Sequence, residues 1–223
     1  MRHHRFLLVT PVFALAVLAG CSSNTVPSVT VVGDSVTSVE HAQLHAALKS
    51  DYTTTYIVSS NGRIGGMSSQ LSSSINSNGD PNVVIINLGT IDALQAGSST
   101  TSTTSGSPLA PLVSATSGTG CVVLTTVNVR ADDRPVHIPD VTVATRINHQ
   151  IKSLAHSDPT KYKVVDWNEF LATLPAASVP TYLQRNDLVE TPAGAAWLAK
   201  SDLAAVHSCG TARQPTVIGP NDA

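Results

Sequence analysis

Charged residues are scarce in this chain of 223 residues, at 13%, and the net charge at pH 7 is only −2. A chain with so little charge has no basic stripe for a nucleic-acid backbone and no polybasic patch for an anionic membrane surface. Aromatic residues make up 4%, and only three residues are cysteine. After the first 20 residues, no apolar stretch approaches the length of a membrane span. We therefore expect no nucleic-acid partner and no spanning helix in the remainder of the chain.

The first 20 residues have the organisation of an export signal. Residues 1–5 carry positive charge, and residues 6–19 form an apolar run about half a membrane span long. The run ends in Leu-Ala-Gly-Cys at residues 18–21, which resembles the bacterial lipobox, whose cysteine is acylated and begins the mature protein. An incidental cysteine after an ordinary secretory cleavage site is the alternative. We expect a lipoprotein anchored at the outer face of the cytoplasmic membrane by a palmitate-type lipid on Cys21, with residues 21–28 as a tether.

The mature chain, of about 200 residues, has the size of one domain. We assign residues 29–210 to this domain and residues 211–223 to a C-terminal tail, and we expect a monomer. Cys121 and Cys209 are an even pair in an oxidising compartment, which favours a disulfide between them. Two free thiols are the alternative, because sequence does not supply the required Cα separation.

Five apolar segments of strand length alternate with segments of helical pattern. This alternation predicts an α/β fold with a parallel sheet covered on both faces, and a functional edge at the carboxyl ends of the strands. The predicted strands are residues 29–33, 54–58, 83–88, 122–127 and 162–165. The predicted helices are residues 38–49, 68–76, 109–115, 141–156 and 192–206.

Two motifs follow predicted strands and therefore fall on one edge of the sheet. Gly-Asp-Ser at residues 33–35 presents a serine where a nucleophile would sit, and Gly-Thr-Ile-Asp at residues 89–92 follows the third strand. Asp34 and Asp92 are expected to cap turns and helix starts on this edge. The serine and threonine tract at residues 98–107 predicts a mobile loop, which could be a solvated insertion, a lid or a glycan attachment site.

The order of these motifs resembles that of the SGNH (GDSL) hydrolases. The resemblance rests on residues 33–35, residues 89–92 and Thr-Pro-Ala-Gly at residues 191–194, and it spans nearly the whole mature chain. It is closest to SGNH domains of actinobacterial envelope proteins and of membrane O-acyltransferases, which have similar motifs to Val-Asn-Val at 127–129, Ile-Asn at 147–148 and Val-Asp-Trp at 165–167. It implies a flavodoxin-like three-layer α/β/α sandwich with a five-stranded parallel sheet. It also implies ester hydrolysis or acyl transfer through a serine, with no cofactor and no metal.

The chemistry of this family needs a serine nucleophile, donors for the oxyanion, and a histidine oriented by an aspartate three residues earlier. Ser35 matches the nucleophile, and its own N–H matches the first oxyanion donor. Gly65 matches the second donor, with Gly66 as the alternative. The third donor is an asparagine amide in the family, and here it is Ile91, which cannot donate. Loss of one such donor typically costs about 100- to 1000-fold in turnover.

The family's Asp-x-x-His-x-Thr segment contains no histidine in this chain. Counting back from Thr191 without a gap places Asn186 and Val189 at the aspartate and histidine positions. One deletion places Asp187 and Glu190 there instead. Glu190 could act as a base in the second case, but a solvated carboxylate with a pKa of about 4.3 is a poor match for a serine hydroxyl.

Another histidine could replace the missing base, and His137, on the loop after the fourth strand, is the best candidate. His41 and His45 lie one turn apart but lack a third ligand nearby, so a solvated helix face explains them better than a metal site. Surface positions are expected for the remaining helical histidines, His149, His156 and His207.

Two functional hypotheses follow from these matches and mismatches. The first is an impaired SGNH-like envelope lipoprotein that binds an acylated or glycan ligand, or a protein partner. The second is a working esterase or O-acyl transfer enzyme that uses Ser35 with an unusual base. The missing donor and base favour the first, and we expect Val189 or Glu190, and no imidazole, beside Ser35. Trp167 and Trp197 are expected to pack helices against the sheet rather than to stack on a sugar.

Overall fold

The computed structural model describes residues 26–96, 107–129, 141–184 and 189–210. Several sequence predictions lie outside these residues: the export signal, Cys21, the serine and threonine tract, His137, Asn186, Asp187 and the C-terminal tail.

A single sheet of five parallel strands forms the centre of the structure, in the order β2-β1-β3-β4-β5. The central strands β1, β3 and β4 are almost continuously buried, whereas the edge strand β2 alternates between exposed and half-buried residues. Buried apolar strands are typical of parallel sheets that are covered on both faces. The strands are β1 (Ser28–Gly33), β2 (Thr53–Val58), β3 (Val83–Asn87), β4 (Cys121–Thr125) and β5 (Tyr162–Val165).

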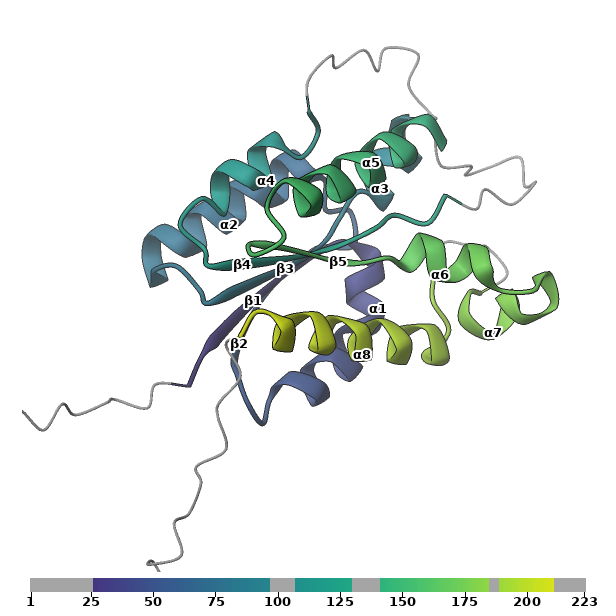
Figure 1. Ribbon diagram of the computed structural model, residues 1–223, viewed down its shortest axis with the longest axis horizontal. Helices are drawn as coiled ribbons and strands as arrows, with labels where there is room; N and C mark the ends of the chain where they lie inside the picture. The colour runs from purple at the N-terminus through teal and green to yellow at the C-terminus, as the bar shows by residue number, and fades with distance from the viewer. Residues whose placement is uncertain (1–25, 97–106, 130–140, 185–188, 211–223) are drawn as a thin grey trace, which may run out of the picture.

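Helices cover both faces of this sheet, as Figure 1 shows. One face carries α2 (Ile64–Asn78), α3 (Thr90–Ala96), α4 (Ala110–Ala115) and α5 (Val141–Ser157). The other face carries α1 (Ser35–Leu48) and α8 (Pro192–Ser208), which pack against each other. Between β5 and α8 lie α6 (Trp167–Thr173), the 3-10 helix η1 (Ala176–Ser178) and α7 (Val179–Tyr182). This is the predicted three-layer α/β/α sandwich. Within the described ranges, no helix combines the length and the apolar character that crossing a membrane requires.

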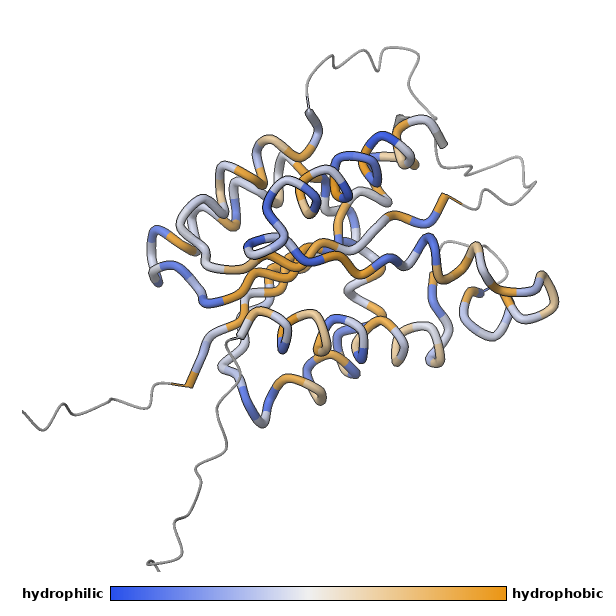
Figure 2. Tube along the Cα trace, in the orientation of Figure 1, coloured by the Kyte–Doolittle hydropathy of each residue, from blue (hydrophilic) through white to orange (hydrophobic). Residues whose placement is uncertain are grey.

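The sheet separates two apolar clusters, and the buried strands stand out in Figure 2 as the most hydrophobic part of the chain. The cluster under α1 and α8 includes Val31, Leu44, Ile85, Val123 and Leu198. The cluster under α2, α4 and α5 includes Val32, Leu71, Ile86, Leu124 and Ile147. Alternate residues of each strand thus point to opposite faces, as the period of two in a strand requires.

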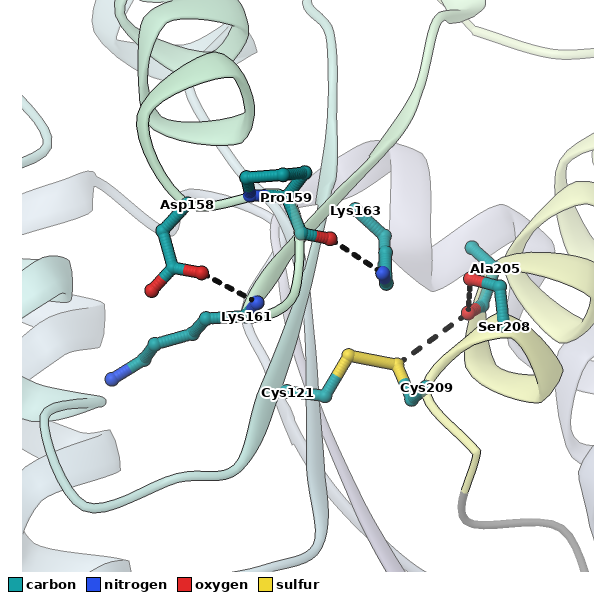
Figure 3. Close-up of a disulfide and its surroundings, with 8 residues drawn as sticks. All are labelled: Cys121, Asp158, Pro159, Lys161, Lys163, Ala205, Ser208 and Cys209. Carbon is teal, nitrogen blue, oxygen red and sulfur yellow. Dashed lines mark hydrogen bonds between the residues drawn. A yellow bond between two sulfur atoms is a disulfide. The ribbon is translucent and has the colours of Figure 1, made fainter.

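A disulfide joins Cys121, the first residue of β4, to Cys209, which follows the last residue of α8 (Figure 3). The Cα atoms lie 5.9 Å apart, within the range that disulfides require. The predicted pairing is therefore confirmed. The bond links residues 88 apart in sequence, and a loop of this length predicts a stabilisation of about 4 to 5 kcal/mol.

Candidate functional site

Ser35 is the first residue of α1, directly after the turn that follows β1, at the carboxyl edge of the sheet. The preceding residue, Asp34, caps α1, because its Oδ1 accepts a hydrogen bond from Val36 N at 3.0 Å. The backbone of this turn is tied to the neighbouring strand, since Asp34 N donates to Asn87 O at 3.2 Å. Ser35 is therefore a half-buried residue at the N-terminus of a helix, directly after a turn fixed from two sides.

The loop between β3 and α3 lies beside this turn. Gly89 has a φ of +117°, and a Cβ there would come within 2.8 Å of the Val127 side chain, so the position requires glycine. Further along, Asp92 Oδ2 accepts a hydrogen bond from Ile64 N at 3.0 Å, and Asp92 Oδ1 lies 3.5 Å from Arg63 Nε. The predicted capping roles of both edge aspartates are confirmed.

The oxyanion positions differ in what they can donate. Gly65 and Gly66 lie in the exposed first turn of α2, where backbone N–H groups have no acceptor within the helix. A Cβ on either glycine would meet nothing within 4 Å, so the space in front of this turn is open. Ile91, at the family's asparagine position, is only 8% exposed and has no polar atom in its side chain. If the predicted oxyanion positions are correct, backbone donors are present at Gly65 or Gly66 and a side-chain donor is absent at Ile91.

Glu190 is fully buried, so the prediction of a solvated carboxylate there is wrong. Its backbone forms an antiparallel bridge with Leu183, and Gln184 Nε2 donates to Glu190 O at 2.9 Å. This short bridge turns the side chain inward. Burial, with a smaller contribution from the nearby Asp34 carboxylate, raises the pKa of Glu190 to about 7. Neither carboxylate oxygen has a hydrogen-bond partner among the described residues.

No hydrogen bond of Ser35 Oγ to a described residue is present, including to Glu190 or to an imidazole. The histidines of the described helices are all exposed, which confirms the prediction that His149, His156 and His207 lie on the surface. His41 and His45 share an exposed face of α1, with ring centroids 6.2 Å apart, and the ring of His41 lies edge-on to Tyr56. In the part of the chain that the structure describes, no three His, Cys, Asp or Glu residues are arranged to hold a metal ion.

The other motifs of the resemblance build the scaffold at the end of β4. Asn148 holds both backbone groups of Val127, accepting from its N at 2.7 Å and donating to its O at 2.8 Å. Asp166 caps α6, accepts a hydrogen bond from Thr126 Oγ1 at 3.0 Å, and lies 2.7 Å from Lys152 Nζ. We therefore assign these residues a structural role, which is to position the backbone and the helix ends, rather than a catalytic one.

The two tryptophans pack as predicted. Trp167 is buried, and its ring lies 5.3 Å from that of Trp197 and 5.6 Å from that of Phe170. Phe170 stacks on Trp197 at 4.0 Å and meets Tyr182 edge-on at 4.9 Å. This aromatic cluster fastens α6 and α7 to α8.

Sequence reasoning missed two buried carboxyl groups behind the site. Glu40, on α1, and Asp202, on α8, are both fully buried, and they interact closely enough that Asp202 raises the pKa of Glu40. Asn87 Nδ2 donates to Glu40 Oε2 at 3.4 Å, and Thr125 Oγ1 donates to Asp202 Oδ1 at 3.5 Å.

Helical spacing could have revealed this pair. Glu40 lies four residues from both Val36 and Leu44, on the buried stripe of α1. Asp202 lies four residues from both Leu198 and Val206 on α8. A carboxylate in the middle of an apolar stripe indicates burial, because residues four apart share one face of a helix.

Comparisons with known proteins identify the fold. No family model and no curated protein matches the sequence. A lipase/acylhydrolase from Enterococcus faecalis matches with a TM-score of 0.64 and 16% identity, over 85% of this chain and 98% of that chain. The C-terminal catalytic domain of peptidoglycan O-acetyltransferase A from Streptococcus pneumoniae matches with a TM-score of 0.63 and 15% identity, over 83% and 96%.

An acetylxylan esterase from Geobacillus stearothermophilus is similar to the same extent, with a TM-score of 0.61 and 16% identity, over 85% of this chain and 97% of that chain. A further structure, from Veillonella parvula, is described as a member of the lipolytic G-D-S-L family. The chain therefore has the fold of the SGNH (GDSL) hydrolases.

Proposed function

We propose that this protein is a cell-envelope lipoprotein whose SGNH-type domain binds an acylated glycan and has lost efficient ester turnover. The observation that carries the proposal is Ile91, buried at the position where the family places its third oxyanion donor. Ser35 Oγ, which has no hydrogen bond to a described residue, adds to it, because a serine hydroxyl without an adjacent base is a weak nucleophile.

The class of ligand follows from the donors that remain. The Ser35 N–H and the amides of the first turn of α2 suit the carbonyl oxygen of an ester, and the open space in front of Gly65 leaves room for it. Two of the similar structures are an acetylxylan esterase and a peptidoglycan O-acetyltransferase domain, whose names denote acetylated sugars. An O-acetylated oligosaccharide is therefore the ligand that we propose.

Calorimetric titration of the chain without residues 1–21 with acetylated xylo-oligosaccharide, and with the deacetylated form, tests this proposal. We expect saturable binding of the acetylated form that Gly65→Trp abolishes, because the indole would fill the open space at the site. Ser73→Trp, on an exposed position of the same helix, is the matched control and should bind as the wild type does. Equal affinity for both sugars, or binding unaffected by Gly65→Trp, would refute the proposed site.

A second candidate function, a serine esterase with Glu190 as its base, is favoured by one observation. Burial raises the pKa of Glu190 to about 7, which is where a general base works best near neutral pH. Hydrolysis of p-nitrophenyl acetate by wild type, Ser35→Ala and Glu190→Gln separates the two functions. We expect all three to share one background rate. Turnover that is lost in both variants and rises with pH through about 7 would establish the esterase instead.

Anchoring through Cys21 is part of the proposal and has its own test. A lipobox cysteine takes up fatty acid in the bacterial envelope, so growth with a palmitate analogue should label the wild-type protein. Cys21→Ala should be unlabelled and released from the membrane fraction. Label retained by Cys21→Ala would mean that the protein is not a lipoprotein of this kind.

A further inference from the structure

Glu40 and Asp202 meet in the interface between α1 and α8, where both side chains are inaccessible to solvent. The sheet presents two neutral polar groups to them, Asn87 from β3 and Thr125 from β4. The segment before α8 adds a third carboxyl group, Glu190, whose charge acts on Glu40.

Two more ionisable groups lie around this pair. Tyr56, on β2, has its pKa raised by burial and by the nearby charge of Glu40. Asp34 lies near enough to Glu190 for its charge to raise the pKa of Glu190, and burial raises the pKa of Asp34 itself to about 7. No lysine, arginine or histidine among the described residues forms an ion pair with any of these carboxyl groups. Within the described ranges, ionisation of these carboxyl groups therefore has no compensating cation.

Hydrogen bonds compensate these carboxyl groups only in part. Glu40 Oε1 and Asp202 Oδ2 have no partner in the part of the chain that the structure describes. Thr37 Oγ1, one turn before Glu40 on the same buried face, is also without a partner. A buried carboxylate in such surroundings is far less favourable than a protonated carboxyl group, which can donate to a second carboxylate.

We propose that Glu40 and Asp202 share a proton as an acid–carboxylate pair that joins α1 to α8, and that this joint loosens when the pair loses its proton. The joint connects the helix that begins at Ser35 to the helix that follows Glu190. The two sides of the candidate site are thereby held together by one titratable contact. This inference does not depend on whether Ser35 is catalytic.

The sign of the pH effect follows from linkage. Burial raises the pKa of Asp202 to about 6 from an ordinary 3.8, and burial together with Asp202 raises that of Glu40 well above 4.5. The folded chain therefore holds protons that the unfolded chain has released. The contribution of this pair to stability is therefore complete below the ordinary pKa values, near pH 4, and is lost as the pH rises from there through the raised pKa values. Within that window each linked proton changes the unfolding equilibrium constant about tenfold per pH unit.

Urea unfolding of the disulfide-intact chain at pH 5 and pH 8 tests the joint. We expect the unfolding equilibrium constant of the wild type to rise by more than tenfold from pH 5 to pH 8. Glu40→Gln or Asp202→Asn, which preserve shape and remove one proton site, should each reduce that rise about tenfold. Glu169→Gln, an exposed acid on α6, is the matched control and should keep the wild-type pH dependence. The same dependence in all variants would overturn the proposal.

An infrared measurement on the wild type covers the case in which the variants do not fold. A protonated carboxyl group in the native protein gives a carbonyl stretch distinct from that of a carboxylate. We expect this band at pH 6 in the folded state and its loss on unfolding at the same pH. Asp34 and Glu190 contribute to the same band at pH 6, because their pKa values are also raised to about 7, so the spectrum is compared with that of the double variant Asp34→Asn and Glu190→Gln. Absence of the band from that folded variant would contradict a shared proton.

Discussion

The two faces of the sheet bury side chains of different chemical character. The face under α2, α4 and α5 buries mainly aliphatic side chains, such as Leu71, Leu124 and Ile147, with neutral polar ones such as Ser68 and Asn148 and, among the described residues, no carboxyl group. The face under α1 and α8 buries aliphatic residues too, but it also encloses the carboxyl groups of Glu40, Glu190 and Asp202, and Asp34 is buried at the edge of the sheet where α1 begins. One chain thus contains an apolar half that favours folding at any pH and a half whose contribution depends on protonation.

This difference indicates where the chain accepts a loss of stability for a purpose other than folding. Buried carboxyl groups destabilise a protein unless they are protonated or paired, and natural proteins keep them mainly where they act. Glu40, Glu190 and Asp202 lie on the face of α1 and α8, and Asp34 directly precedes Ser35 at the edge of the sheet. The disulfide of α8 lies on the same face, since Cys121 and Cys209 belong to its apolar cluster. A covalent link there offsets the cost of the carboxyl groups.

Removing the disulfide should have the largest effect. Cys121→Ala with Cys209→Ala is expected to lower the free energy of unfolding by about 4 to 5 kcal/mol, because the unfolded chain regains the freedom of a long loop. Native-state hydrogen exchange should show that α8 loses more protection than α5, which lies on the apolar face. Equal loss in both helices would mean that the two faces are not distinct in stability.

A cavity on each face should separate them by pH. Ile147→Ala and Leu44→Ala each remove a fully buried side chain and should cost roughly 2 to 5 kcal/mol by urea unfolding at pH 5. The cost of Ile147→Ala should be the same at pH 8. That of Leu44→Ala should shrink at pH 8, because water in the cavity can solvate the carboxyl group of Glu40 one turn away. Identical pH behaviour of the two variants would contradict the comparison.

The sequence predicted the sheet and the long helices because their signals are strong. Each central strand is a continuous apolar run, and alternation with helical segments leaves few other folds. Four predicted helices begin too late or end too early, since helix ends such as those at Asp34 and Arg63 lie outside the periodic pattern. The short helices α3, α6 and α7 were missed because four to seven residues show too little periodicity.

Only those residues of the candidate site that belong to a sequence motif could be predicted. The Gly-Asp-Ser turn and the mismatch at Ile91 are visible in the sequence, because each sits at a fixed distance from a strand end. The inward direction of Glu190 is not visible, because it depends on an antiparallel bridge to Leu183 that has no sequence signature. The Glu40–Asp202 pair needs two helices to meet, so the spacing on either helix alone indicates burial without naming the partner.

The two edge aspartates offer the smallest and sharpest test, since both cap helices in different surroundings. Asp92 is partly solvated and lies beside Arg63, with side-chain exposures of 16% and 58%. Asp92→Ala should lower stability by about 1 kcal/mol at pH 5 and at pH 8, the usual cost of a lost cap.

Asp34 is fully buried, and that burial raises its pKa to about 7. Asp34→Asn keeps an oxygen for Val36 N and removes the ionisation, so it should stabilise the protein at pH 8 relative to pH 5. Thermal unfolding of both variants at the two pH values measures the contrast, and a pH-independent effect of Asp34→Asn would show that this carboxyl group is ionised throughout.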